Sequence, residues 1–190
     1  MAGTGLAEAT DPGLVTDGLA AGARTAAALA DGLTNPLVEL AIATAILVPV
    51  IVFHGWCLGL VSRGFSTRFA LYTPATPGWR PRLVIGITIA SLVVIHLVET
   101  LLWTVPILWL DVMTNFRDAY YYVLEAYTTL GEGNVALPDR WRLVGPVIAI
   151  SGLFTFGWTA SVLVYVMGEA GRLHADRSKA AAGEKGVGRG

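Results

Sequence analysis

The segment TTLGEGN, at residues 128–134, is the most informative part of the chain about its fold. Its two glycines stand two positions apart, and it follows a run at 116–128 that is rich in aromatic residues. That run makes about three helical turns, whereas crossing ~30 Å of hydrocarbon takes about 20 helical residues. Long apolar segments flank the loop on both sides. A half-length helix followed by an extended, glycine-containing segment between two spans predicts a re-entrant loop.

Such a loop has a specific use in a membrane. Non-helical backbone is tolerated at membrane depth only where protein buries it or where it lines an aqueous path. A ring of backbone carbonyl oxygens can replace the hydration shell of a cation. Successive carbonyls point at one axis when ordinary and positive φ alternate, which Gly131 and Gly133 are predicted to allow. The short helix aims its partly negative C-terminus at the same axis. One loop supplies a quarter of a ring, so a cyclic homotetramer is predicted.

Three apolar segments divide the chain into spans and connections. The predicted spans are an additional helix at 35–62, an outer helix at 83–110 and an inner helix at 143–168. With the pore helix at 116–128 and the filter at 128–134, the last two form a pore domain at 83–168. The remaining parts are a weakly structured N-terminal segment at 1–34, a cytoplasmic or interfacial loop at 63–82 and a cytoplasmic tail at 169–190.

The composition agrees with an all-α membrane protein. The chain is 54% hydrophobic and only 14% charged, with a mean hydropathy of +0.61. A soluble domain carries about 25% charged residues. A net charge of −1 excludes a nucleic-acid partner held by phosphate neutralisation. No nucleophile elbow, phosphate-binding loop or zinc-ligand spacing is present, so we expect no enzyme and no cofactor other than permeating ions.

Basic residues set the predicted orientation. Four arginines lie in 63–82 and five basic residues lie in 169–190. By the positive-inside rule both segments are cytoplasmic. The N-terminus and the segment at 111–142 are therefore predicted to face outside, and the C-terminus is predicted to face the cytoplasm. Trp103 and Trp109, near one end of the second span, are predicted to lie in an interfacial aromatic belt.

Residues 128–133 resemble the TTVGYG signature of potassium channels, with Leu130 in place of valine and Glu132 in place of tyrosine. Glu125 stands where some prokaryotic potassium channels keep a carboxylate behind the filter. The resemblance covers about 83–167 and includes an inner-helix start at Trp141-Arg142-Leu143. It implies the pore-forming subunit of a tetrameric channel that passes monovalent cations, K⁺ and Na⁺, across the bilayer.

His96-Leu97-Val98-Glu99 resembles the second span of bacterial three-span members of this superfamily. The resemblance therefore implies a bacterial inner membrane. The residues expected to form the filter and coordinate ions are Thr128, Thr129, Leu130, Gly131, Glu132, Gly133 and Asn134. The residues expected to support the filter from behind are Glu125, Tyr121 and Tyr122.

Glu132 is the departure from the family pattern that bears most on selectivity. In the family, the tyrosine at this position packs against pore-helix aromatics and holds the carbonyl ring at a fixed width. A flexible carboxylate cannot pack in that way, and burying four unpaired charges is costly. Gly-Glu-Gly-Asn resembles the Gly-Asp-Gly-Asn filter of non-selective prokaryotic channels. We expect weak discrimination between Na⁺ and K⁺, with Ca²⁺ blocking or permeating at the filter mouth, because carboxylate oxygens bind Ca²⁺ well.

The alternative for Glu132 is that neighbouring donors such as Tyr121 or Tyr122 hold the carboxylate and K⁺ selectivity survives. Two other pairs are also open to two interpretations. His96 and Glu99 share one helix face, and they form either a structural clamp or a proton sensor. Gly152 and Gly157 form either a gating hinge or a close helix contact.

Two remote alternatives belong to other classes of protein. The first is a non-conducting assembly subunit. The second is a membrane haem or metal redox protein that uses His54 and His96. Counting from the cytoplasmic arginines puts these histidines roughly 7–8 Å apart in depth, which argues against a shared haem. We therefore predict no metal site beyond the permeating ions.

Overall fold

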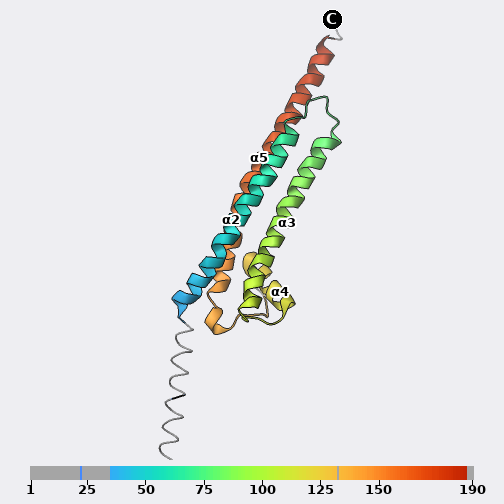
Figure 1. Cartoon of the computed structure of the whole chain (residues 1–190). Coiled ribbons are helices and arrows are strands. Elements are labelled where there is room, and N and C mark those ends of the chain that lie inside the picture. Colours follow the sequence, from blue (N-terminus) through green and yellow to red (C-terminus); the bar gives the residue numbers. More distant parts are fainter. Residues whose placement is uncertain (1–21, 23–34, 132, 188–190) are drawn as a thin grey trace, which may run out of the picture.

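The computed structural model describes residues 22, 35–131 and 133–187. Its elements are α2 (Pro36–Phe69), α3 (Trp79–Trp109), α4 (Phe116–Tyr127), the 3₁₀ turn η1 (Asp139–Trp141) and α5 (Val144–Val187). Three long helices lie side by side along one axis, and the short α4 is held at one end of them (Figure 1). The described part of the chain is helical and contains no strand, which confirms the predicted all-α class.

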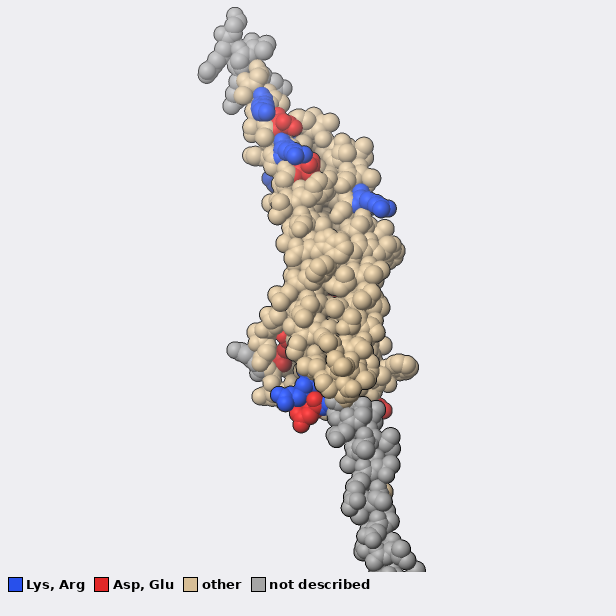
Figure 2. All heavy atoms as spheres, turned by 90° about the vertical axis from the view of Figure 1, so that its left-hand side faces the viewer, with Lys and Arg blue, Asp and Glu red and all other residues tan. Residues whose placement is uncertain are grey.

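Three helical segments are long and apolar enough to cross a membrane. Their most apolar stretches, in α2, α3 and the segment formed by η1 with α5, have mean hydropathies of 2.4, 2.2 and 1.9. Large apolar side chains face outward along them, and Val48, Val94 and Leu153 are 55%, 56% and 63% exposed. On the face drawn in Figure 2, charged residues lie near the two ends and uncharged residues cover the surface between them. The three-span integral membrane architecture is confirmed.

Both helices of the first hairpin extend further than the sequence indicated. The predicted loop at 63–82 is reduced to 70–78, because α2 continues to Phe69 and α3 begins at Trp79. Phe65 and Phe69 are buried in a cluster with Val166 of α5, and this packing keeps the end of α2 helical. Arginines that the sequence indicated as loop residues therefore lie on helix.

The third span also continues, through the predicted tail at 169–190, as far as Val187. This segment has no proline and is rich in alanine, glutamate, lysine and arginine, which are strong helix formers. The predicted N-terminal segment at 1–34 lies outside the described residues, apart from residue 22.

Asparagine side chains begin two of the helices. Asn35 accepts a hydrogen bond from the backbone N–H of Leu37 at 2.9 Å, and Asn115 accepts one from Arg117 at 2.9 Å. Each bond satisfies a backbone donor that has no partner within its helix. The second bond fixes where α4 starts, and therefore where the re-entrant loop begins.

Trp103 does not belong to an interfacial belt, contrary to the sequence-based prediction. It is fully buried, and its indole N–H donates to the hydroxyl of Ser151 on α5 at 3.2 Å. Trp109 is 85% exposed, two turns further along α3. Trp103 instead belongs to the main core, where α2, α3, α4 and α5 meet around Ala43, Val123 and Ile148.

Candidate functional site

The backbone leaves the helix immediately after α4, and positive φ then occurs at every second residue. Thr128 caps α4, and the N–H of Leu130 donates to the carbonyl of Glu125 at 2.9 Å. Thr129 has φ 59° and Gly131 has φ 66°, with Leu130 between them. Gly131 was expected to take positive φ, but Thr129 was not, because a β-branched residue rarely adopts it. A strained backbone of this kind is typical of functional sites.

Most of the filter loop faces outward in the single chain. Residues 128–131 and Asn134 are exposed, and the apolar side chain of Leu130 is 61% exposed. Glu132 lies outside the described residues, so the expectations placed on it stay predictions, as does the expected positive φ of Gly133. An exposed apolar side chain of this kind is often covered by another protein surface.

Glu125 lies directly behind the loop. Its side chain is 6% exposed, and Oε1 has no hydrogen-bond partner among the described residues. A Cβ added at Gly133 would overlap the Glu125 carboxylate. The second glycine is therefore needed for close approach to this carboxylate. Glu125 thus lies against the loop at Gly133, and its expected role in supporting the filter stays a prediction.

The two tyrosines expected to assist the filter take different places on α4. The hydroxyl of Tyr122 lies against Gly145 near the start of α5, where a Cβ would overlap it. Tyr121 is 48% exposed on another side of α4. The structure thus places Tyr122 between the pore helix and the inner helix.

The two candidate hinge glycines also differ. A Cβ added at Gly152 would overlap the carbonyl oxygen of Tyr127, the last residue of α4. A Cβ added at Gly157 would meet nothing within 4 Å. Gly152 is therefore a contact point at which the inner helix touches the end of the pore helix.

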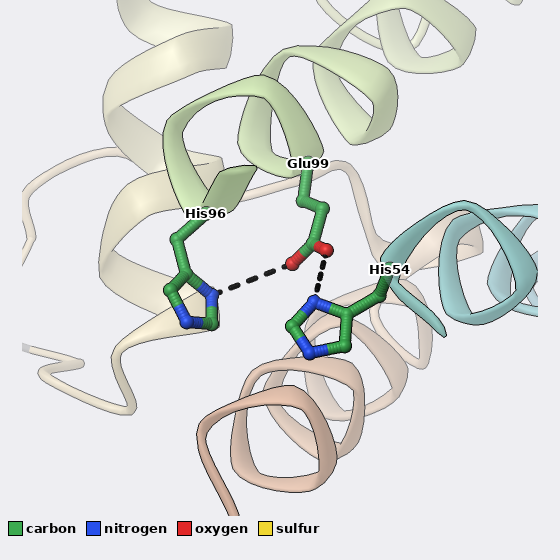
Figure 3. Close-up of side chains that lie close together, drawn as sticks. All are labelled: His54, His96 and Glu99. Carbon is green, nitrogen blue, oxygen red and sulfur yellow. Dashed lines mark hydrogen bonds and ion pairs between the residues drawn. The ribbon is translucent and has the colours of Figure 1, made fainter. Parts of the chain in front are cut away.

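A buried polar cluster joins the additional span to the pore domain, and Figure 3 shows its three ionisable members converging. His54 comes from α2, while His96 and Glu99 come from α3 (Figure 3). His54 Nδ1 lies 2.5 Å from Glu99 Oε1, and His96 Nδ1 lies 3.4 Å from Glu99 Oε2. The side chains of His54 and Glu99 are both 0% exposed. The expected clamp of His96 and Glu99 thus includes a residue of the first span that was not assigned to it.

Hydroxyl groups complete this cluster. Tyr127 of α4 donates its hydroxyl to Glu99 and lies 2.9 Å from His96 Nδ1 and 2.6 Å from the hydroxyl of Thr155. The hydroxyl of Thr159 lies 3.1 Å from His96 Nε2 and 3.4 Å from His54 Nε2. Helices α2, α3, α4 and α5 therefore each contribute at least one side chain to a single hydrogen-bonded network.

The depth argument made from the arginines was wrong. The rings of His54 and His96 lie 5.4 Å apart, centroid to centroid. His54 lies 15 residues before the end of α2, and His96 lies 17 residues after the start of α3. Measured from the true hairpin turn, the two depths differ by about 3 Å. The arginines gave a wrong reference because they lie on helix and not in the loop.

Two histidines and a glutamate are side chains of metal-binding types, and one ligand atom from each lies within 4.8 Å of the others. The shortest contact among them is a hydrogen bond and is too short for two ligands of one metal ion. Ligand atoms bound tetrahedrally to Zn²⁺ at about 2.0–2.2 Å lie about 3.4 Å from one another. His54 Nδ1 and Glu99 Oε1 are 2.5 Å apart, which is a hydrogen-bond distance. The Nε2 atoms of both histidines are hydrogen-bonded to the hydroxyl of Thr159. We therefore describe these groups as a hydrogen-bonded network.

Glu39 has a role that the sequence did not indicate. It is 7% exposed near the start of α2 and accepts hydrogen bonds from the backbone N–H groups of Leu143 and Val144, the latter at 3.2 Å. These donors stand at the N-terminus of α5, where a negative charge is favourable. The additional span thus caps the inner helix.

Replacing Glu39 by alanine is expected to destabilise the folded chain by about 1–2 kcal/mol, the usual cost of losing a helix cap. Glu39→Gln should lose less, because its amide oxygen still accepts a hydrogen bond. Thermal unfolding in detergent measures both. An unchanged melting temperature in Glu39→Ala would show that the cap does not contribute to the stability of the folded chain.

A half-length helix between two membrane-spanning helices, followed by a strained loop, is the arrangement found in pore-loop ion channels. Residues 83–169, 87 of the 190 residues, match the family model described as "Ion channel", so this part of the chain is similar to a pore domain of the potassium-channel superfamily. The matched segment begins in α3 and ends within α5, so α2 lies outside it. Searches of curated proteins and of solved structures each found no match to the chain.

Proposed function

We propose that four copies of this chain form a pore through which monovalent cations cross the membrane. The observation that carries the proposal is the positive φ at Thr129 and Gly131, immediately after a half-length helix that cannot span the bilayer. Alternating backbone of this kind turns consecutive carbonyls toward one side. Four such loops around an axis make a ring that can replace an ion's hydration shell.

The proposed orientation follows the basic residues. Arg63, Arg68, Arg80 and Arg82 lie at the hairpin end of α2 and α3, and α5 carries further basic residues beyond the same end. Under the positive-inside rule this end is cytoplasmic, the filter is at the outer end and the N-terminus is outside. A bacterial inner membrane is the proposed location, as the resemblance to bacterial three-span channels implies.

Ion flux from purified protein in liposomes tests the proposed function. Vesicles loaded with K⁺ and diluted into an impermeant salt should release K⁺ when they carry the protein, and empty vesicles should not. Parallel vesicles loaded with Na⁺ compare the two ions. Absence of flux for every cation would favour a non-conducting assembly subunit. A haem absorption band or a bound metal in the purified protein would favour the redox alternative.

Weak selectivity between Na⁺ and K⁺ is the proposed consequence of Glu132. Replacing the tyrosine of the family signature by a carboxylate removes the packing that fixes the ring and adds four negative charges near the outer mouth. These oxygens also suit Ca²⁺, which should block or permeate. K⁺ selectivity is the alternative, in which donors such as Tyr121 or Tyr122 hold the carboxylate.

The reversal potential under bi-ionic Na⁺/K⁺ conditions should lie near zero in the wild type. In Glu132→Tyr it should move strongly toward the K⁺ value, because the family side chain is restored. Asp139→Asn is the control for a general surface-charge effect, since Asp139 is 97% exposed in the turn that follows the loop. A wild-type value already biased strongly to K⁺ would select the alternative.

A further inference from the structure

The network around His54 and Glu99 has one proton fewer than the number of its hydrogen-bond contacts when both imidazoles are neutral. It contains five contacts that each need a proton: His54 Nδ1 with Glu99, Glu99 with Tyr127, Tyr127 with His96 Nδ1, and Thr159 with each Nε2. With neutral imidazoles and an ionised carboxylate, each imidazole, Tyr127 and Thr159 bring one proton each. Four protons therefore serve five contacts, and one buried nitrogen is left without a donor.

Thr155 does not make up the shortfall. Its hydroxyl is 2.6 Å from that of Tyr127, and it also lies 3.0 Å from the carbonyl of Ser151. A third contact joins it to the carbonyl of Gly152 at 3.1 Å. The single proton of Thr155 serves one of these three contacts and so adds none to the five. An unpaired polar atom in a buried site has lost its hydration without gaining a hydrogen bond, which is unfavourable.

One added proton completes the network. An imidazolium at His54 donates from Nδ1 to Glu99 and from Nε2 to Thr159. Thr159 can then donate to His96 Nε2, His96 Nδ1 donates to Tyr127, and Tyr127 donates to Glu99. Every contact now holds one proton. The 2.5 Å contact of His54 with Glu99, against 3.4 Å for His96, favours His54 as the charged ring.

Charge balance points the same way. Glu99 is 0% exposed inside a membrane-spanning helix, where an uncompensated carboxylate is expensive. Among the described residues, no lysine or arginine forms an ion pair with Glu99. An imidazolium beside it makes the network neutral as a whole.

The groups that face this network come from every helix packed against it. α2 contributes His54 and, within electrostatic reach of Glu99, the thiol of Cys57. α3 contributes His96 and Glu99, and α4 contributes the Tyr127 phenol. α5 contributes two threonine hydroxyls and the ring of Trp158, whose centroid lies 5.7 Å from that of His54. Among the described residues that face the network, the groups able to carry a positive charge are thus the two imidazoles.

We propose that His54, His96 and Glu99 form a binding site for a single proton, which couples pH to the end of the pore helix. Tyr127, which carries the phenol of the network, is the last residue of α4 and directly precedes Thr128 of the filter. Its carbonyl group also lies against Gly152 of the inner helix. After loss of the proton, Thr159 donates to His54 Nε2 and His96 donates from Nε2 to Thr159. His96 Nδ1 and Glu99 then compete for the single proton of Tyr127, which weakens the hold on its side chain. His96, 13% exposed, is the member that can exchange protons with its surroundings.

Nitrogen NMR of the reconstituted chain tests proton binding without relying on conduction. Protein labelled with ¹⁵N-histidine carries His54, His96 and His174, and the last is exposed on the cytoplasmic extension of α5. A His174→Gln background leaves the two buried rings. We expect one imidazolium per chain at the acidic end of pH 5–8, lost in a one-proton titration. Two neutral rings at every pH, or two imidazoliums, would overturn the assignment.

The coupling to the pore rests on the proposed channel function and has its own test. Cation flux should fall several-fold as pH rises from 5 to 8 in the wild type, and His54→Gln should make the profile flat. Thr159→Ala should act similarly by removing the shared hydroxyl, whereas Thr159→Ser keeps the hydroxyl and should behave as the wild type. Flux that is present but insensitive to pH overturns the coupling. No flux at any pH counts against the channel itself, and the NMR titration still decides the proton site.

Discussion

Replacing Gly131 by alanine is expected to abolish cation flux. Gly131 has φ 66°, a conformation that costs an L-residue roughly 1–2 kcal/mol. In the proposed tetramer each of the four chains bears this cost, so the substitution strains the ring at four positions. A chain that relieves the strain turns the neighbouring carbonyl away from the axis, and the ion loses its ligands.

Gly157→Ala is the matched control for this substitution. It makes the same chemical change on α5, at a position where an added Cβ meets nothing within 4 Å. We expect Gly157→Ala to conduct as the wild type does. Flux from liposomes, normalised to the amount of incorporated protein, measures both variants. Wild-type flux in Gly131→Ala would contradict the role assigned to the loop.

Gly152→Val is expected to destabilise the folded chain strongly. An added Cβ would overlap the carbonyl oxygen of Tyr127 and lie 2.9 Å from its carbonyl carbon and 3.2 Å from its ring. Backbone atoms cannot move aside as a flexible side chain can, so α5 would have to separate from α4. Overpacking of this kind costs about 1–3 kcal/mol, and sometimes more.

Tryptophan fluorescence during thermal unfolding in detergent measures that loss, and Gly157→Val controls for the effect of a β-branched residue in α5. We expect a clearly lower melting temperature for Gly152→Val than for Gly157→Val. A Gly152→Val protein that unfolds like the wild type but opens differently would contradict the contact and favour the hinge.

The sequence predicted the layout of the pore domain well, because its signals are local. Apolar length gave the three spans, and the aromatic run at 116–128 gave a pore helix that the structure ends at Tyr127. Asn115, before that run, is a good N-cap residue. Gly131 was assigned positive φ because only glycine adopts it without strain.

Contacts between distant segments could not be predicted in the same way. The depth of His54 relative to His96 depends on where the hairpin turns. Arg63 was used as the reference for the end of the first span, but α2 continues to Phe69. Glu39 reaches the start of α5 across the bundle, a contact that no sequence spacing encodes. Thr129 adopts positive φ against its own preference, under the constraint of the loop.

The additional span is the part of the molecule that the family match leaves unexplained, and its contacts give it a structural place. α2 packs on both α3 and α5. It supplies Glu39 to the start of the inner helix and His54 to the network that holds Tyr127. These two side chains stand at different levels of the bundle, so the span supports residues 83–169 both at the start of α5 and beside Tyr127 at the end of α4.

Diffraction from crystals of the membrane-reconstituted protein grown in Rb⁺ tests the central claim most directly. We expect a four-fold axis with anomalous density for Rb⁺ along it, within coordination distance of the carbonyl oxygens of Thr129, Leu130 and Gly131. An assembly in which residues 128–134 lie away from every symmetry axis, with no cation density beside them, would contradict it.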